Sequence, residues 1–270
     1  MPVGIFDSGL GGLTILAEAQ KKLPNQAFVY FGDNANTPYG AKSAAQISTM
    51  TRAGVTQLFA AGCDLVILAC NTASAVALHD LQVDWLPTDK RVLGVFVPMI
   101  EELTRRDWGD NTPPTHTGLR DVALFATPAT VASGAFAREL KFRARDVDVV
   151  SQACDGLVAA IEKGDTLGAE ILVKTHVNSL LQALPAPQAA VLGCTHFPLV
   201  EAMFRAALPA GTKLLSQPGV VGDSLADYLG RHPRFIETGD VTYLTSGDPA
   251  AISDLAAQFL GHSLPFRTAD

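Results

Sequence analysis

The amino-acid sequence predicts an α/β fold with two pseudo-symmetric domains, each a mostly parallel sheet with flanking helices, and a functional site between them. Short apolar runs alternate with longer amphipathic segments along the 270-residue chain, as in consecutive βαβ units. Two apolar runs resemble each other, because residues 65–72 and 189–196 both end in a small residue, a cysteine and polar residues. This repeat indicates that the two halves share one plan.

The expected elements follow this alternation in order. Apolar runs of strand length and periodic apolar faces predict, in the first half, strands at 2–6, 27–31, 65–69 and 91–97 and helices at 12–23 and 43–61. A polar segment at 107–121 is expected to be an exposed loop. The second half predicts strands at 122–126, 148–151, 189–193 and 213–215, and helices at 129–140, 165–184, 199–207, 219–229 and 249–260. We expect one domain of residues 1–97 completed by 210–270, and a second of residues 98–209.

Composition excludes several classes of protein. A net charge of −7 without a Lys/Arg cluster argues against partners such as nucleic acid or an anionic membrane surface. No apolar stretch approaches the roughly 18 residues of a membrane-spanning helix, and the N-terminus lacks the pattern of a signal peptide. The four cysteines lack the spacing of a disulfide scaffold, which indicates a reducing, cytoplasmic location. A small anionic substrate stays compatible with the negative total.

Cys70 and Cys194 are the candidate reactive residues, because each stands at the polar end of its apolar run. Ligands of open α/β sheets bind at the carboxyl ends of strands, so both thiols are expected beside a ligand. The alternative is that an unpaired cysteine acts as a small buried hydrophobe, which suits Cys63 and Cys154 better. A metal site is not expected, since no C-x-x-C spacing occurs. His196, two residues after Cys194, and Asp7 are the candidate partners.

Two loops follow the first two strands and carry further candidates. Residues 7–12 contain three glycines before a helix, which permits close backbone approach to an anion. Their spacing is not that of a dinucleotide-binding loop, and a tight turn capped by Asp7 is the alternative explanation. Their place at the carboxyl end of a strand favours the functional one. Residues 31–40 supply a carboxylate, amides and a Tyr-Gly pair, although such residues also simply build turns.

Four segments together resemble the glutamate racemase family, within the broader aspartate/glutamate racemases. They are residues 4–12, residues 31–33 with Pro38-Tyr39-Gly40, residues 69–74, and residues 193–198. They occur in the family's order. The resemblance implies cofactor-independent interconversion of L- and D-glutamate, supplying D-glutamate to peptidoglycan, with a homodimer as the expected assembly.

The resemblance also implies roles for individual residues. Cys70, assisted by Asp7, would act on the D enantiomer, and Cys194, assisted by His196, on the L enantiomer. Inversion without a swivelling intermediate needs two opposed groups, one thiolate and one thiol. The amino-acid substrate would be held by Ser8, Asp33, Tyr39, Gly40, Asn71, Thr72, Thr127, Thr130 and Thr195, with Asp33 on the ammonium side.

Some positions depart from the family pattern. Asn34 stands where a small hydroxyl residue is more common, Cys154-Asp155 replaces a usual Cys-Pro, and residues 107–121 form an insertion. Glu162 matches an acidic residue that some members have near the second cysteine. Racemisation of aspartate or a hydantoin, and a non-catalytic amino-acid-binding protein, are the alternative functions.

Overall fold

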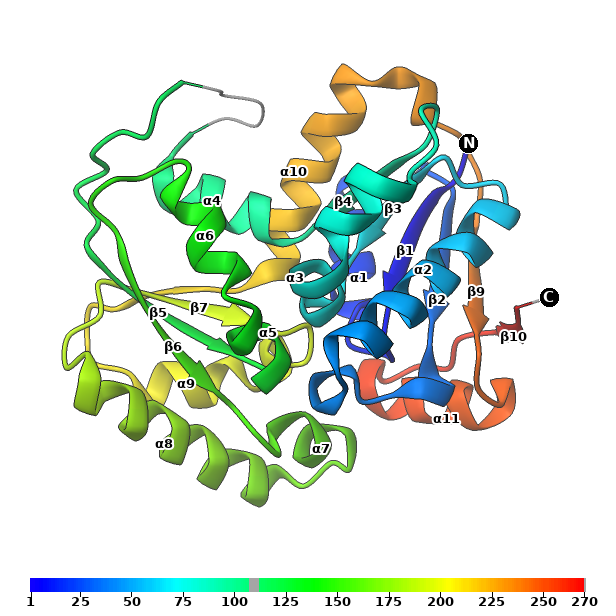
Figure 1. Cartoon of the computed structure of the whole chain (residues 1–270). Coiled ribbons are helices and arrows are strands. Elements are labelled where there is room, and N and C mark those ends of the chain that lie inside the picture. Colours follow the sequence, from blue (N-terminus) through cyan, green and yellow to red (C-terminus); the bar gives the residue numbers. More distant parts are fainter. Residues whose placement is uncertain (107–111, 270) are drawn as a thin grey trace.

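The computed structural model describes residues 1–106 and 112–269, and shows two parallel sheets, each between layers of helices (Figure 1). The expected α/β class is therefore confirmed. The expected loop at 107–121 lies partly outside the described residues. Within the described ranges, no helix is long and apolar enough to cross a membrane.

The first sheet has six parallel strands in the order β10-β9-β2-β1-β3-β4. Its strands are β1 (Val3–Asp7), β2 (Phe28–Gly32), β3 (Leu65–Leu68), β4 (Arg91–Gly94), β9 (Val241–Thr245) and β10 (Phe266–Thr268). The two last strands were not expected from the sequence. They bring the C-terminal end of the chain beside β2, at the edge of the sheet (Figure 1).

The second sheet has four parallel strands in the order β6-β5-β7-β8. They are β5 (Asp121–Ala126), β6 (Asp148–Ala153), β7 (Ala189–Gly193) and β8 (Lys213–Leu215). The chain leaves the first sheet after β4 and returns to it through α10, after β8. The division of the chain into domains at 97/98 and 209/210 stays a prediction.

The helices mostly match the periodic apolar faces seen in the sequence. The expected ranges did not include α3, α4 and α7. The helix expected at 129–140 is split at Gly134, whose φ of +61° interrupts the helical backbone. The α-helices are α1 (Leu13–Lys22), α2 (Ala44–Ala60), α3 (Asn71–Asp80), α4 (Phe96–Thr104), α5 (Pro128–Ser133), α6 (Ala135–Lys141), α7 (Leu157–Glu162), α8 (Thr166–Ala183), α9 (Glu201–Ala207), α10 (Gln217–Arg231) and α11 (Pro249–Leu260). Short turns of helix lie at Asn34–Asn36, Tyr39–Ala41, Leu81–Trp85, Phe197–Val200 and Pro233–Phe235.

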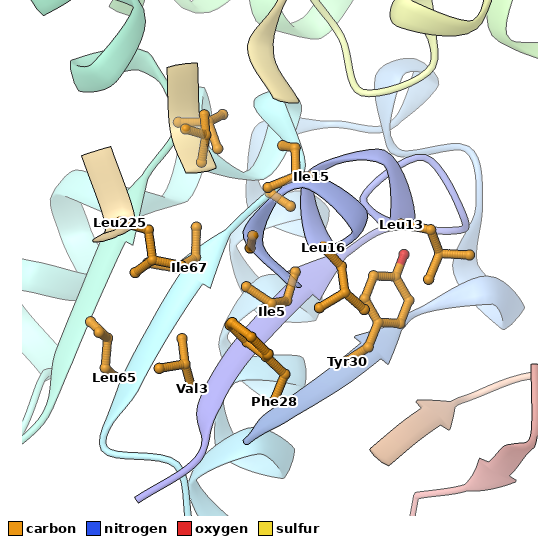
Figure 2. Packing of buried hydrophobic residues seen from close by; sticks show 14 of the residues in the cluster. Val3, Ile5, Leu13, Ile15, Leu16, Phe28, Tyr30, Leu65, Ile67 and Leu225 are labelled. Carbon is orange, nitrogen blue, oxygen red and sulfur yellow. The ribbon is translucent and has the colours of Figure 1, made fainter. Parts of the chain in front are cut away.

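Alternate residues of each central strand pack on opposite faces of its sheet, because successive side chains of a strand point in opposite directions. On one face, Val3 and Ile5 of β1 pack with α1 and α10 (Figure 2). On the other face, Phe6 packs with α2 and α3. The strands are apolar on both faces because helices cover both. Helix α10 also contacts α4, so it packs against elements that belong to both lobes.

Candidate active site

The carboxyl ends of the central strands place the predicted residues side by side. Asp7 ends β1 opposite Gly32 of β2, and Phe6 pairs with Leu68 of β3, two residues before Cys70. In the second sheet Ala126 pairs with Gly193, so Thr127 and Cys194 follow neighbouring strands. Parallel strands therefore deliver these residues to one edge of each sheet, as the sequence predicted.

Cys70 forms the N-cap of α3, where its sulfur accepts a hydrogen bond from the Ala73 amide at 3.5 Å. The thiol donates to Ser8 Oγ at 3.4 Å. Burial, with the Asp7 carboxylate nearby, raises the pKa of Cys70 to about 12. The site therefore holds Cys70 as a thiol at neutral pH.

Cys194 has a different environment, because a charged pair lies against it. Its sulfur is 3.9 Å from His196 Nδ1, and His196 Nε2 is 3.0 Å from Glu162 Oε1. Burial opposes a charge on this imidazole, but hydrogen bonds to Cys194 and Glu162 outweigh it and raise the pKa of His196 to about 10. The pair of His196 and Glu162 therefore lies directly beside the Cys194 sulfur. The two cysteines thus have unlike electrostatic neighbours, the Asp7 carboxylate near Cys70 and the pair of His196 and Glu162 beside Cys194.

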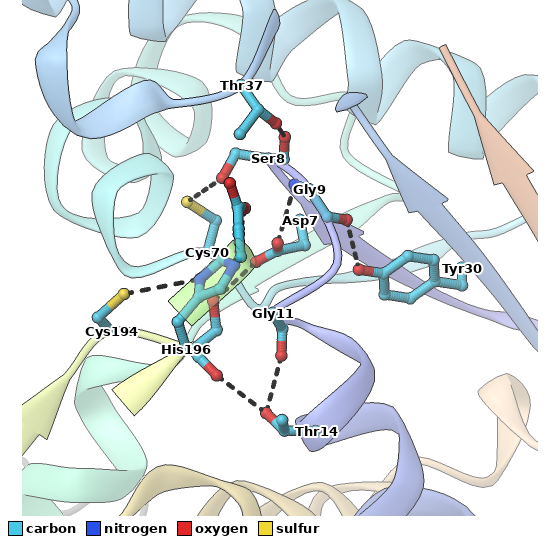
Figure 3. Close-up of polar contacts among 12 residues, drawn as sticks. Asp7, Ser8, Gly9, Gly11, Thr14, Tyr30, Thr37, Cys70, Cys194 and His196 are labelled. Atoms are coloured by element: carbon cyan, nitrogen blue, oxygen red, sulfur yellow. Dashed lines mark hydrogen bonds and ion pairs between the residues drawn. The ribbon is translucent and has the colours of Figure 1, made fainter. Parts of the chain in front are cut away.

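Asp7 lies between the two thiol environments and is completely buried. Its carboxylate accepts hydrogen bonds from the Gly9 amide at 2.9 Å and from Thr195 Oγ1 at 3.3 Å. Burial raises its pKa, while the charge of His196 opposes that rise. The bond from Thr195 joins the Cys70 side of the site to the loop that carries Cys194. In Figure 3 both sulfur atoms lie on the same side of Asp7 and His196.

Three threonine hydroxyls connect the lobes at the start of α3. Thr72 Oγ1 lies 2.9 Å from Thr127 Oγ1 and 3.3 Å from Thr130 Oγ1, and the latter two are 2.9 Å apart. All three residues are buried. Hydroxyls can donate or accept, so this cluster can turn its donors to a carboxylate.

The other predicted residues divide into two kinds. The side-chain amide of Asn71 is buried, and neither its nitrogen nor its oxygen has a hydrogen-bond partner, so it is available to a ligand. Tyr39 and Asp33 are also buried, but the Tyr39 hydroxyl donates to Asp33 Oδ2 at 2.6 Å. A Cβ added at Gly40 would lie 2.9 Å from Thr127 Cβ, so the backbone there touches the second lobe.

Sequence reasoning did not assign a role to Glu162 or Thr14. Glu162 ends α7, far in the sequence from His196, and only the three-dimensional structure pairs them. Thr14 Oγ1 donates to Gly11 O at 2.8 Å and lies 3.3 Å from Thr195 O (Figure 3). Its place in an ordinary helix-start pattern gave no signal of this contact.

Two observations concern other possible kinds of site in the described part of the protein. Among the described residues, no cluster of three or more His, Cys, Asp or Glu side chains has the geometry of a metal site. A cavity of about 500 Å³ lies behind α3, against α4, α6 and α10, and none of the predicted site residues lines it. The candidate site is thus the region of the two thiols, not this cavity.

The fold and the site together define a two-lobed α/β protein with two buried cysteines, each beside acid–base side chains. The chain belongs to the Asp/Glu/Hydantoin racemase family, whose family model matches residues 14–217. The glutamate racemase of Paracoccus denitrificans is 58% identical over 270 residues, the full length of both chains.

Solved structures agree with this assignment. The structure of glutamate racemase from Thermus thermophilus in complex with β-chloro-D-alanine matches with a TM-score of 0.81 and 32% identity, covering 99% of this chain and 96% of that one. That of the Francisella tularensis glutamate racemase with D-glutamate matches with a TM-score of 0.84 and 27% identity, covering 98% and 95%.

Proposed function

We propose that the protein racemises glutamate by moving the Cα proton between Cys70 and Cys194. One observation carries the proposal: the two buried thiols have unlike acid–base neighbours, the Asp7 carboxylate near Cys70 and the pair of His196 and Glu162 beside Cys194. Full-length similarity to glutamate racemases supports glutamate as the substrate.

Starting from L-glutamate, the Cys194 thiolate takes the proton from Cα. The Cys70 thiol then gives its proton to the opposite face of Cα and becomes a thiolate. The starting form returns when Cys194, now a thiol, loses its proton to solvent and Cys70 takes one from solvent, with His196 and Asp7 as the acid–base groups beside them. Starting from D-glutamate, the same steps run in reverse. The electron pair left on Cα is delocalised into the substrate carboxylate, so donors aimed at that carboxylate lower the barrier.

The described residues supply such donors. Ser8, Asn71 and Thr195 lie next to the two thiols in the chain or in space, and their hydroxyl and amide groups suit the α-carboxylate and the ammonium group. The Thr72, Thr127 and Thr130 hydroxyls, with the backbone at Tyr39 and Gly40, suit the second carboxylate. Because both carboxylates are anionic, neutral donors bind them without demanding a positive net charge.

The cellular setting follows from this activity. We propose a cytoplasmic enzyme that needs no pyridoxal phosphate, works as a homodimer and supplies D-glutamate to peptidoglycan. The buried acid–base groups beside each thiol support proton transfer by the chain's own residues.

The test is to incubate the purified protein with L- or D-glutamate in deuterated water, without added pyridoxal phosphate, and to follow Cα deuteration and optical rotation. We expect Cα deuteration and a loss of optical rotation with either enantiomer. Cys70→Ala and Cys194→Ala should each lower racemisation by orders of magnitude. Full racemisation by both single variants would contradict the two-thiol mechanism. Activity confined to aspartate or a hydantoin would change the substrate, and no exchange with any of them would favour a binding protein.

A further inference from the structure

The carboxylate of Asp33 is fully occupied by side chains of the protein. Oδ1 accepts hydrogen bonds from Ser246 Oγ at 2.6 Å and from Asn36 Nδ2 at 3.0 Å. Oδ2 accepts from Tyr39 Oη at 2.6 Å and from Asn36 Nδ2 at 3.1 Å. A carboxylate has about four acceptor positions, so these contacts use its capacity. Asp33 is built to hold its neighbours rather than to take a substrate ammonium group.

One of these donors comes from the far end of the chain. Ser246 lies in the turn between β9 and α11, and its Oγ also accepts a hydrogen bond from the Ala35 amide at 3.1 Å. The preceding residue, Thr245, is fully buried and donates to Asn34 Oδ1 at 2.8 Å. Two successive hydroxyls of the C-terminal segment therefore fasten residues 33–35. The second of these contacts also gives Asn34 a partner within the protein.

The loop of residues 33–35 continues to Tyr39 and Gly40, which lie where we propose that substrate binds. Tyr39 is buried, with its hydroxyl on Asp33, and the next residue, Gly40, touches Thr127 of the second lobe. The hydroxyl of Thr37 also donates to the backbone oxygen of Ser8, beside Cys70. A shift of Asp33 would therefore move Tyr39 and Gly40 relative to the thiols and to the second lobe.

We propose that Ser246 is a positioning residue for the reaction, which acts through Asp33 to fix Tyr39 and Gly40 where substrate binds. The inference rests on the proposed racemisation of glutamate. Ser246 touches neither thiol in the described contacts, and its side chain is largely exposed, so its replacement removes little packing. Its effect should therefore appear in substrate binding rather than in stability.

The test compares Ser246→Ala with Ser246→Thr, which keeps the hydroxyl, and with the matched control Ser253→Ala. Ser253 lies in the same C-terminal segment, but its hydroxyl bonds to Pro249 O in α11. We expect Ser246→Ala to lower kcat/KM for glutamate about fivefold to tenfold, mainly through KM, as the net loss of one ordinary hydrogen bond predicts for an exposed hydroxyl that water can partly replace. Ser246→Thr should restore most of it, and Ser253→Ala should match the wild type.

A double-mutant cycle separates positioning from a structural effect. If Ser246 acts through Asp33 on Tyr39, Ser246→Ala should cost little further activity in a Tyr39→Phe background. Equal losses in both backgrounds, or a Ser246→Ala variant as active as Ser253→Ala, would overturn the proposal while leaving the racemase activity intact.

A protein without any exchange of the glutamate Cα proton would instead refute the proposed function. In that case, amide hydrogen exchange of the ligand-free protein tests whether Ser246 positions the loop. Ser246→Ala should speed exchange of the amides at residues 39–42, and unchanged exchange there would refute the positioning role.

Discussion

Replacing Gly11 by alanine tests whether the close contact between the lobes sets the geometry of the two thiols. Gly11 precedes α1, and a Cβ at this position would collide with Thr195 Oγ1 and lie 2.6 Å from His196 Nδ1. Both neighbours belong to the loop that carries Cys194. No flexible side-chain end is available to yield, because Thr195 is bonded to Asp7 and His196 to Glu162.

The size of the effect follows from these distances. Ordinary contact with a Cβ begins at 3.4 Å. The Cys194 loop must therefore withdraw by about 1 Å, and a misplacement of that size at a reacting group can cost about 10²-fold in rate. The loss should fall mainly on kcat, because the thiolate and the Cα proton must meet in the transition state. Thermal stability should change far less than activity.

The assay is the initial rate of Cα deuteration and of racemisation from each enantiomer, with the melting temperature measured beside it. Gly230→Ala is the matched control, since a Cβ there meets nothing within 4 Å and the residue lies inside α10. A Gly11→Ala variant that keeps activity within twofold of the wild type would show that the lobes do not depend on this contact.

Further changes test the electrostatics of the site. Glu162→Gln should lower the pKa of His196, because the Glu162 carboxylate helps to raise it to about 10. Activity from L-glutamate, which we expect to decline near pH 10 in the wild type, should then decline at a lower pH in the variant. A pH–rate profile identical to that of the wild type would refute this. Because folding raises the pKa of His196 from 6.5 to about 10, its stabilisation is complete below pH 6.5 and is lost as pH rises toward 10. The difference in unfolding free energy between wild type and His196→Asn, from urea titrations at pH 6 and pH 9.5, should shrink accordingly, and a constant difference would contradict it. Asn71→Ala should raise KM about tenfold without lowering the melting temperature, because the buried amide has no partner to lose; a destabilised variant with normal KM would assign Asn71 a structural role instead.

The sequence alone was sufficient to predict the strands and helices whose positions depend on the local pattern of apolar residues. Runs such as 65–68 and 189–193 are apolar on both faces, which only a covered parallel strand accommodates, and both became β3 and β7. Cys70 and Cys194 follow these strands, so their place at the sheet edges was predictable. The prediction of one continuous helix at 129–140 was wrong. The positive φ of Gly134 divides it into two helices, although the apolar pattern of the sequence is periodic across this position.

Only the tertiary structure decided which distant groups hold the polar residues around these cysteines. Glu162 reaches His196, and Ser246 reaches Asp33, across 34 and 213 residues of sequence. No local pattern encodes such contacts, because they depend on α7 packing beside the turn Phe197–Val200 and on β9 joining the first sheet beside β2. The sequence thus determined that two thiols end two buried strands. Burial and charge at the packed site, set by residues distant in the chain, decided which acid–base groups surround each thiol.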